Sequence, residues 1–290
     1  MLNRTNSIFL IFVSSLITIK TFSQEEIKER IYNYTLSSVE GHNGMYDWKM
    51  KKADELATRS EDVSTLEVST KDWMPAIVPG TVLNSLVYND VYPEPYYGVN
   101  NKLESQLIPD LYHAGRDFYT YWFRTEFNAE ESLFKDRKIW MQVDGINYRA
   151  EIWLNGKMVG NLSGMFLQKQ LEITDYVVYN QPNVLAVKVY PVDSPGTIKP
   201  KGGKSFGAEG EFQNGGNGEI GRNVTQLMTV GWDFTFLDGI RDRNTGIWKD
   251  IKIFTTGKTI LNHPFVKSEL AKPNYDSSKQ TVSVEVAYPT

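Results

Sequence analysis

The residues best suited to chemistry lie close together in residues 230–251, VGWDFTFLDGIRDRNTGIWKDI. Aromatic side chains and carboxylates are neighbours there, as in the pair Trp232 and Asp233. An aromatic ring covers the apolar C–H face of a pyranose, and an adjacent carboxylate accepts hydrogen bonds from the sugar hydroxyls. The stretch is therefore typical of a sugar site. The same pattern also fits a β-corner in which Trp232 and Trp248 are core residues and the acids are solvated.

Two strands and a corner must position these side chains. Residues 230–236 are expected to form a strand that runs into a turn, and residues 246–253 the strand that leaves it. In the corner at 241–244, the two arginines are expected to hold the turn through ion pairs with nearby acids. Asp242 and Asn244 of the same corner are candidates for contact with a substrate.

Other catalytic groups are sparse or badly spaced. The chain has no cysteine, which excludes disulfides and thiolate chemistry. Its three histidines (His42, His113 and His263) are far apart and lack the spacing of metal ligands or of a catalytic triad. The GxGxxG match at 216–221 follows a glycine-rich coil rather than a strand, so it is not a dinucleotide fingerprint. We therefore expect neither a catalytic metal nor a cofactor, and a structural calcium ion stays an open alternative.

The composition and the N-terminus limit the partners and the location. A net charge of −4 provides no basic field, so nucleic acid is excluded as a partner. Residues 1–23 have the pattern of a secretory signal peptide, with Arg4 before an apolar run at 8–19. Removal of that segment leaves no membrane span, and a retained N-terminal anchor is the alternative. An exported chain without cysteine is expected to be a bacterial periplasmic or secreted protein.

Short strands dominate the middle of the chain. Residues 119–127 alternate between apolar and polar side chains, with Trp122 as the exception, and predict a half-buried strand. Further strands follow through residue 190, and Asn155-Gly156 is the strongest two-residue signal for a hairpin. Many short strands with turn signals between them predict an all-β fold, an antiparallel β-sandwich of the jelly-roll kind.

Two short helices and one loop are expected before these strands. Residues 25–37 form a candidate helix, and residues 82–89 form another that the preceding threonine caps. The proline-containing segment 91–101 is expected to be an ordered loop. Tyr96, Tyr97 and the pair Asn100-Asn101 are expected to brace the loop against the sandwich. The alternative is that they line the route of a sugar chain.

The pattern changes again after the last strand of the sandwich. Residues 24–257 are expected to form the jelly-roll domain, and the following residues resemble an interdomain linker. Two strands then follow at 265–270 and 280–287, so residues 258–290 are interpreted as a linker and the start of a truncated second β-sandwich. Two strands cannot form a sandwich by themselves. Either this tail pairs with the first domain, or the chain is the front part of a longer protein.

Several stretches together resemble the N-terminal domain of glycoside hydrolase family 2, in the exo-β-glucosaminidase and β-mannosidase branch. Each stretch is of modest specificity alone, but all occur in the order of the family. They extend over most of residues 48–253. The matching segments are VPGTVLNSLVYNDVYPEPYYGVNN (78–101), YTYWFRTEF (119–127), VDGINYRAEIWLNGK (143–157) and the VGWDF and IRDRNTGIWKDI parts of 230–251.

The resemblance implies a galactose-binding-like jelly-roll domain, then an immunoglobulin-like sandwich and a (β/α)₈ barrel with two catalytic glutamates. Such enzymes hydrolyse the O-glycosyl bonds of terminal β-linked sugars, glucosaminides or mannosides, with retention of configuration. The resemblance also places Trp232 and Asp233 against the terminal sugar. Relatives often have tryptophan at the position of Phe234. Phenylalanine cannot donate an indole hydrogen bond, so the sugar preference of the family does not carry over directly.

The chain is too short to contain both this domain and the expected catalytic barrel. A (β/α)₈ barrel takes about 250 residues, and only residues 256–290 follow the last expected strand of the jelly roll. The barrel and its glutamates are therefore expected in a further part of the same polypeptide or in an adjacent one. We expect a non-catalytic sugar-binding domain, inactive alone, whose partners are carbohydrate and that barrel. The alternatives are a free-standing carbohydrate-binding module and an inactive fragment of a split gene.

Overall fold

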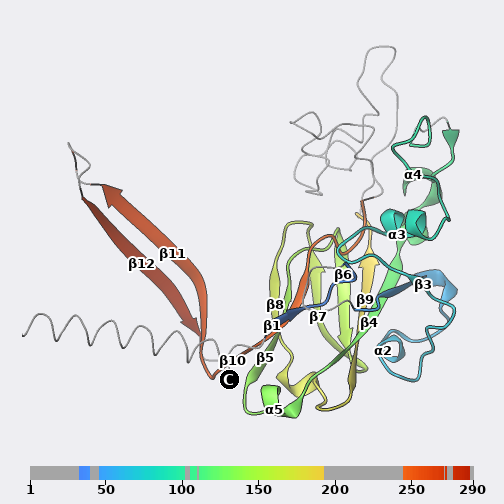
Figure 1. Cartoon of the computed structure of the whole chain (residues 1–290). Helices are drawn as coiled ribbons and strands as arrows, with labels where there is room; N and C mark the ends of the chain where they lie inside the picture. The colour runs from blue at the N-terminus through green and yellow to red at the C-terminus, as the bar shows by residue number, and fades with distance from the viewer. Residues whose placement is uncertain are drawn as a thin grey trace, which may run out of the picture.

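Two antiparallel β-sheets, stacked face to face, form the body of the molecule (Figure 1). The computed structural model describes residues 33–39, 46–101, 105–109, 111–192, 244–270, 272 and 277–287. Trp232, Asp233 and Asp242 lie outside the described residues. The same holds for the strand expected at 230–236 and for the expected signal peptide, which both stay predictions. Asn244 is described, and it is the residue at which the description resumes.

The two sheets have four and six strands. The four-stranded sheet has the order β1 (Asn33–Thr35), β10 (Ile251–Thr256), β5 (Lys138–Val143) and β8 (Lys169–Glu172). The six-stranded sheet has the order β3 (Met74–Pro75), β2 (Lys49–Lys52), β4 (Tyr121–Asn128), β9 (Pro182–Tyr190), β6 (Arg149–Leu154) and β7 (Lys157–Ser163). Every neighbouring pair in both sheets is antiparallel. The expected all-β antiparallel sandwich is confirmed.

One hydrophobic core lies between the two sheets. It contains Met141 and Ile253 from the four-stranded sheet and Phe123 and Val187 from the six-stranded sheet, all fully buried. In β5 and β10, every second residue is buried. This alternation is that of a strand with one face on a core, because successive side chains point to opposite faces. The two-residue period of the sequence thus decides which side of each strand faces inward.

Strand β4 differs from its prediction, because it is buried on both faces. The face toward the main core contains Phe123, as the alternation predicts. On the opposite face, Trp122 packs with Trp73 and Val63 in a second, smaller cluster. Arg124 is 4% exposed on that face, and its Nη2 donates to the carbonyl oxygen of Thr65 at 3.0 Å. The half-buried prediction is wrong because an earlier part of the chain folds over the outer face of the sheet.

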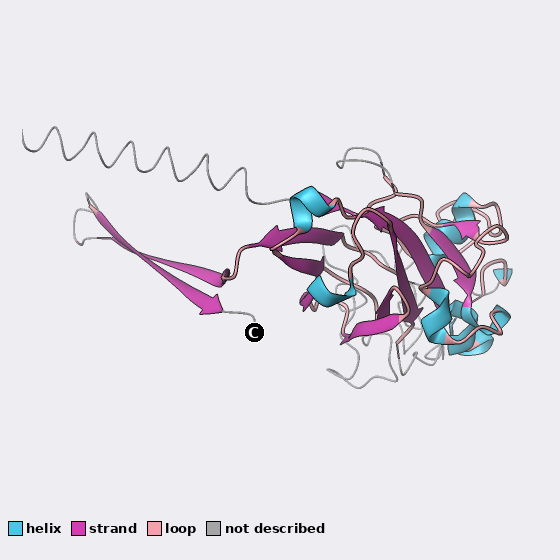
Figure 2. Ribbon diagram, turned by 90° about the horizontal axis from the view of Figure 1, so that it is seen from below, coloured by secondary structure: helices cyan, strands magenta, loops and turns pink. Residues whose placement is uncertain are grey.

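Short helices lie outside the two sheets (Figure 2). They are α2 (Ser60–Val63), α3 (Val82–Tyr88), α4 (Leu111–Ala114), α5 (Glu131–Phe134) and the 3₁₀ turns η1 (Ala53–Glu55), η3 (Arg116–Tyr119) and η4 (Thr174–Tyr176). Helix α3 confirms the predicted helix after Thr81, whose Oγ1 accepts a hydrogen bond from the backbone nitrogen of Asn84 at 2.9 Å. None of the described helices has both the length and the apolar character that a bilayer crossing requires.

The segment expected to be the first helix is a strand where it is described. Strand β1 pairs with β10, with Tyr34 opposite Ile253. Tyr34 is buried, and its ring stacks on that of Tyr46 at a centroid distance of 6.1 Å. The helix expected over 25–37 is therefore wrong at residues 33–35. Sheet pairing and the burial of Tyr34 outweigh the local apolar spacing.

The hairpin predicted at Asn155-Gly156 is confirmed. It joins β6 to β7, and both turn residues have positive φ, 50° at Asn155 and 83° at Gly156. Such a pair of left-handed residues matches the twist of the flanking strands, and asparagine and glycine adopt it at the lowest cost. The Oδ1 of Asn155 also accepts a hydrogen bond from the backbone nitrogen of Val184 at 2.8 Å, which fixes the turn to β9.

Residues 91–101 form a loop without helix or strand, as predicted. The role expected for its tyrosines is wrong, because the side chains of Tyr96 and Tyr97 are 76% and 77% exposed. The loop is held by its asparagines instead. The Nδ2 of Asn100 donates to the carbonyl oxygen of Glu94 at 2.9 Å, and Asn101 is buried. The expected role therefore holds for the asparagines, while Tyr96 and Tyr97 face outward and Tyr92 packs on the core.

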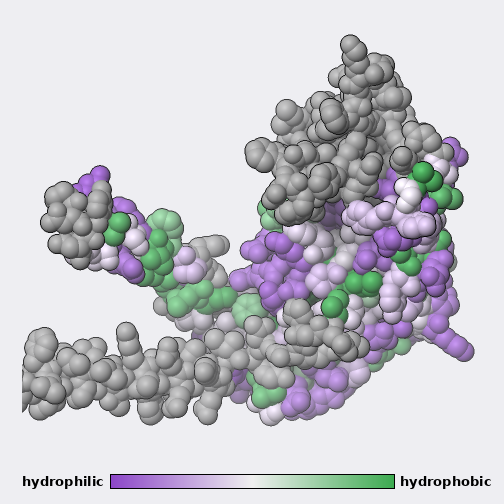
Figure 3. All heavy atoms as spheres, turned by 45° about the horizontal axis from the view of Figure 1, so that its top comes forward, coloured by the Kyte–Doolittle hydropathy of each residue, from purple (hydrophilic) through white to green (hydrophobic). Residues whose placement is uncertain are grey.

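The last described strands form a hairpin that projects from the sandwich (Figure 1). Strand β11 (Ile260–Leu270) begins inside the expected linker and, among the described strands, pairs with β12 (Ser278–Ala287) alone. The cross-strand register places six large apolar side chains on one face, and green spheres are visible along the projecting hairpin in Figure 3. The six are each at least 45% exposed: Leu261, Val266, Leu270, Val282, Val284 and Val286. Phe265, 64% exposed, lies on the opposite face. The one-sided arrangement of the six fits the first strands of a further sandwich, which stays a prediction.

Removal of residues 258–290 is expected to leave the thermal midpoint of the sandwich within about 2 °C of the full chain. Among the hairpin side chains that are described, Ile260 alone is buried, so little packing is lost. The full chain is expected to self-associate through the open apolar face, and the truncated chain is not. Calorimetry and light scattering measure the two effects.

The matched control for this truncation keeps the length of the chain. The double variant Val282→Lys with Val286→Lys adds charge to the apolar face and is expected to suppress self-association as the truncation does. A fall of the midpoint by more than about 5 °C after truncation would show instead that the hairpin is part of the sandwich.

Candidate functional site

One end of the sandwich collects the residues around the expected sugar site. At this end β6 begins and β9 finishes, with Arg149 opposite Tyr190. Asn147 lies just before β6 and forms an isolated antiparallel bridge with Gly246. The backbone nitrogen of Asn147 donates to the carbonyl oxygen of Gly246 at 2.9 Å, and the reverse bond measures 2.8 Å. This bridge brings Asn244, the described candidate residue, to the same end of the fold.

Asn147 and Asn244 form an incomplete amide pair. The Nδ2 of Asn147 donates to both the backbone oxygen and the Oδ1 of Asn244, at 2.9 and 2.7 Å. Asn147 is 1% exposed. Its own Oδ1 and the Nδ2 of Asn244 are buried without a hydrogen-bond partner in the described part of the chain. Each such atom costs about 1–3 kcal/mol unless a ligand or water completes it. The pair thus presents one acceptor and one donor to a missing polar group.

Two glycines allow the close backbone approach that positions Asn244. The backbone nitrogen of Gly80 donates to the carbonyl oxygen of Ile247 at 2.7 Å, and that of Val82 donates to Thr245 at 2.8 Å. Gly246 lies between these two bonds. A Cβ there would meet the backbone of Gly80 and lie 2.5 Å from the Cα of Thr81. Glycine is therefore required at 246 for the segment to pack on the start of α3.

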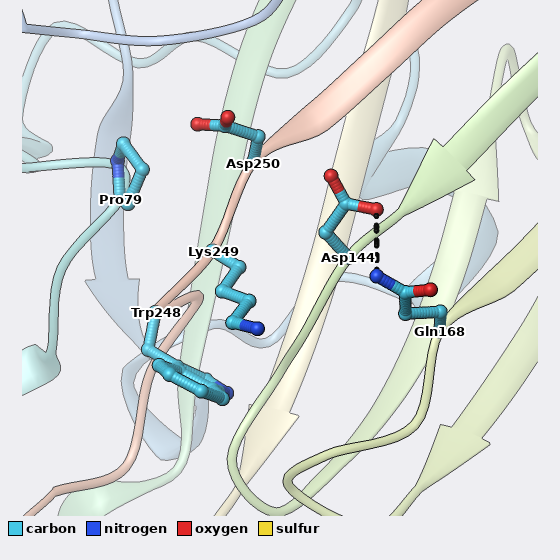
Figure 4. Close-up of a pocket in the computed structure, with 6 residues that line it drawn as sticks. All are labelled: Pro79, Asp144, Gln168, Trp248, Lys249 and Asp250. Carbon is cyan, nitrogen blue, oxygen red and sulfur yellow. Dashed lines mark hydrogen bonds between the residues drawn. The ribbon is translucent and has the colours of Figure 1, made fainter. Parts of the chain in front are cut away.

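A shallow recess of about 320 Å³ opens near this backbone contact (Figure 4). Figure 4 shows Asp144 and Gln168 on one side of the recess and the consecutive residues Trp248, Lys249 and Asp250, which lead into β10, on the other. The full lining is Pro79, Asp144, Gln168, Trp248, Lys249 and Asp250. The recess thus combines an aromatic ring, an amide and charged groups of both signs.

The carboxylate of Asp144 is already engaged by its neighbours. Its Oδ2 lies 2.6 Å from the Nζ of Lys252, and its Oδ1 accepts hydrogen bonds from Gln142 at 3.0 Å and from Gln168 at 3.4 Å. Asp250 lies 3.8 Å from the same lysine. Because Lys252 balances these acids, they anchor the recess and do not form the separated acid and nucleophile that glycoside hydrolysis needs.

Trp248 forms a fixed wall of this recess. Its Nε1 donates to the carbonyl oxygen of Met165 at 2.9 Å, and its ring meets Phe166 edge-on at 5.7 Å. The Nζ of Lys249 lies 4.7 Å from the ring centroid. A Cβ on Gly145 would lie 2.9 Å from the indole nitrogen. Trp248 is half-buried and lines the recess rather than the core, so the alternative in which it is a core residue does not hold. These contacts fix its ring and its N–H in place.

The structure therefore tests only part of the predicted site. It brings Asn244 to the end of the sandwich, whereas Trp232, Asp233 and Asp242 lie outside the described residues. It adds Asn147, which was not a candidate from the sequence. The available signal was an asparagine directly before a predicted strand, but nothing local shows that it pairs with a residue 97 positions away. In the described part of the chain, no three histidine, aspartate or glutamate residues gather as metal ligands.

The fold and this end of it define a class of protein, a galactose-binding-like β-sandwich with a polar site at one rim. Residues 48–249 match the family described as glycosyl hydrolase 2 galactose-binding domain-like. Because this match covers most of the chain, the chain belongs to that family. The resemblance noted from the four sequence segments is thereby confirmed.

Relatives of known activity and solved structures agree with this assignment. The chain is 37% identical over 213 residues to a mannosylglycoprotein endo-β-mannosidase of Lilium longiflorum, covering 72% of this chain and 20% of that protein. It is 21% identical over 253 residues to an exo-β-D-glucosaminidase of Streptomyces avermitilis, covering 86% of this chain and 23% of that protein. The exo-chitosanase CsxA of Amycolatopsis orientalis has the same fold, with a TM-score of 0.61, 21% identity and coverage of 89% of this chain and 24% of that one. The chain thus spans about a fifth to a quarter of the length of these relatives.

Proposed function

We propose that this chain is the non-catalytic sugar-binding domain of a longer glycoside hydrolase, in which it forms one wall of the substrate pocket. The observation that supports this proposal most directly is the incomplete amide pair of Asn147 and Asn244. In the described part of the chain, its acceptor and donor have no partner, and they lie at the end of the sandwich where β6 begins and β9 ends. The Trp232–Asp233 pair comes shortly before Asn244 in the sequence.

The proposed substrate is a β-mannoside or a β-glucosaminide. The relatives reported above carry these activities in their names, and all of them are several times longer than this chain. The chemistry is assigned to two glutamates in a separate barrel domain. In the described part of the chain, the acids of the recess are tied to Lys252, which supports a positioning rather than a catalytic role for this domain. The difference at Phe234 leaves the choice of sugar to experiment.

Asp233→Ala in the longer enzyme is expected to lower kcat/KM on nitrophenyl β-mannoside or β-glucosaminide about 10- to 100-fold, the effect of losing one hydrogen bond to a charged group. The thermal midpoint is expected to stay unchanged. The longer enzyme is obtained by sequencing the DNA beyond codon 290. The matched control is Asp47→Ala, because the Asp47 side chain is 78% exposed and pairs only loosely with Lys49 at 3.2 Å.

Two results would contradict the proposal. Unchanged kinetics of the Asp233→Ala enzyme would remove that residue from the site. Turnover of either glycoside by the purified 290-residue chain would show that no separate catalytic domain is needed. A stop after codon 290 with no adjacent barrel gene, together with sugar binding by the chain alone, would favour a free-standing carbohydrate-binding module.

A further inference from the structure

The loop at residues 91–101 carries the most exposed aromatic pair of the described chain. Tyr96 and Tyr97 are 76% and 77% exposed, and three aliphatic side chains of the same region are about half exposed (Val91, Val99 and Leu107). Single exposed apolar residues are common, but a group concentrated in one segment marks a binding surface. The proposed function so far makes no use of this surface.

The loop holds its tyrosines in a fixed frame. The backbone nitrogen of Tyr97 donates to Glu94 at 3.2 Å, and that of Asn100 donates to Tyr97 at 3.2 Å. The side-chain amide of Asn100 donates to the carbonyl oxygen of Glu94 at 2.9 Å. The turn is therefore closed by its own hydrogen bonds, while the rings remain open to solvent. A frame formed in advance reduces the ordering cost of binding.

Two anchors place this loop at the same end of the sandwich as the incomplete amide pair. Helix α3 precedes the loop, and its first residue Val82 is hydrogen-bonded to Thr245, the neighbour of Asn244. Tyr92, within the loop, packs on the core, and the start of β4 at Tyr121 lies opposite the end of β9. Seven residues of helix span about 10 Å. The loop therefore starts about one helix length away from the contact between Val82 and Thr245.

We propose that the Tyr96–Tyr97 loop is a stacking platform for sugar units beyond the terminal one. This inference rests on the proposed function and adds a second contact region for its substrate. A tyrosine ring covers the C–H face of a pyranose, and its hydroxyl exchanges hydrogen bonds with the sugar. The most exposed members of the surface are these amphipathic rings, while the aliphatic side chains around them are less exposed. An amphipathic ring that is open to water suits a hydrated sugar chain.

The test measures binding of β-1,4-mannobiose, β-1,4-mannohexaose and a chitosan hexamer to the 290-residue chain by calorimetry and NMR shifts. One of the two hexamers is expected to bind about tenfold more tightly than the biose, since only a longer chain covers two rings. The double variant Tyr96→Ala with Tyr97→Ala is expected to lose this advantage. Its thermal midpoint is expected to match that of the unmodified chain, because both side chains are exposed.

The matched control is Tyr88→Ala. Tyr88 is 64% exposed but lines a different recess, beside Pro75 and Tyr46, so its loss is expected to leave oligosaccharide binding unchanged. Equal affinity of the double variant and the unmodified chain for the hexamers would overturn the inference. So would an equal loss in the Tyr88 variant, or no binding of any oligosaccharide. A change in self-association without a change in sugar binding would show that the loop is an interface between copies, and would also overturn it.

The two proposals can fail separately. The kinetics of the Asp233→Ala enzyme test the terminal-sugar wall and do not involve the tyrosines. The length dependence of binding tests the platform and does not involve Asp233. A length-dependent affinity that the tyrosine variants abolish, together with unchanged Asp233→Ala kinetics, would keep the platform and reject that residue as the terminal contact.

Discussion

Replacing Gly246 with alanine is expected to lower the thermal midpoint of the chain by about 6–12 °C, which corresponds to about 3 kcal/mol for a domain of this size. A Cβ at this position would lie 2.5 Å from the Cα of Thr81 and closer still to the carbonyl oxygen of Gly80. These are backbone atoms, so no side-chain rotation relieves the clash. The segments must separate, and the hydrogen bond from Gly80 to Ile247 is lost with them.

The matched control for this substitution is Gly257→Ala. A Cβ at Gly257 meets no described atom within 4 Å, so this variant is expected to keep the midpoint of the unmodified chain to within about 2 °C. Calorimetry of both variants gives the comparison. If Gly246→Ala unfolds at the same temperature as Gly257→Ala, the contact between the start of α3 and residues 245–247 is not needed for stability. The fixed position of Asn244 would then lose its physical basis.

Replacing Asn147 with alanine is expected to lower kcat/KM of the longer enzyme about 10- to 100-fold, with a stability loss of at most about 2 kcal/mol. The activity falls because the free Oδ1 of Asn147 and the orientation of Asn244 are both lost. The stability loss is small because the pair is incomplete in the free protein. Removing Asn147 breaks two hydrogen bonds but also removes one buried unpaired oxygen.

The matched control is Asn183→Ala, at the opposite end of the sandwich. Asn183 is fully buried, and its Oδ1 accepts from the backbone of Val178 and from Asn155, both at 2.8 Å. Its Nδ2 donates back to Val178 at 2.9 Å. Because these partners are left unpaired, the variant is expected to lose about 2–4 kcal/mol of unfolding free energy. Its kcat/KM is expected to remain that of the unmodified enzyme.

The two asparagines therefore separate structure from function. Steady-state kinetics and denaturant unfolding are measured on both variants. Asn147→Ala is expected to lose activity and keep most of its stability, whereas Asn183→Ala is expected to lose stability and keep its activity. If Asn147→Ala loses as much stability as Asn183→Ala and keeps its activity, Asn147 is a structural residue. The amide pair would then no longer support the proposed wall of the pocket.

Predictions from the sequence succeed where the physical cause is local. The turn at Asn155-Gly156 requires two residues that accept positive φ, and the sequence shows them. The start of α3 requires a side-chain oxygen three residues before an unpaired backbone nitrogen, and Thr81 supplies it. Both features depend on neighbours within four positions, so no knowledge of the fold is needed to find them.

Predictions fail where a distant segment decides the environment. Strand β4 is predicted to be half-buried, yet Trp122 and Arg124 on its outer face are covered by residues of an earlier segment. Residues 33–35 match a helix locally, yet pairing with β10 makes them a strand. In both cases the deciding contact crosses from one segment to another. Tyr96 and Tyr97 are expected to brace their loop together with Asn100 and Asn101, yet both rings are exposed and the asparagines hold the loop.

By itself the sequence determined the class of fold, the family and the segments that carry the candidate site. Alternation with period two and turn residues are properties of the chain alone, and they specify which residues become strands. The tertiary structure alone decided that Asn244 meets Asn147, that Gly246 must be glycine and that the paired tyrosines face solvent. The physical reason is that these facts are distances between atoms far apart in sequence, and such distances are set when the two sheets close on one core.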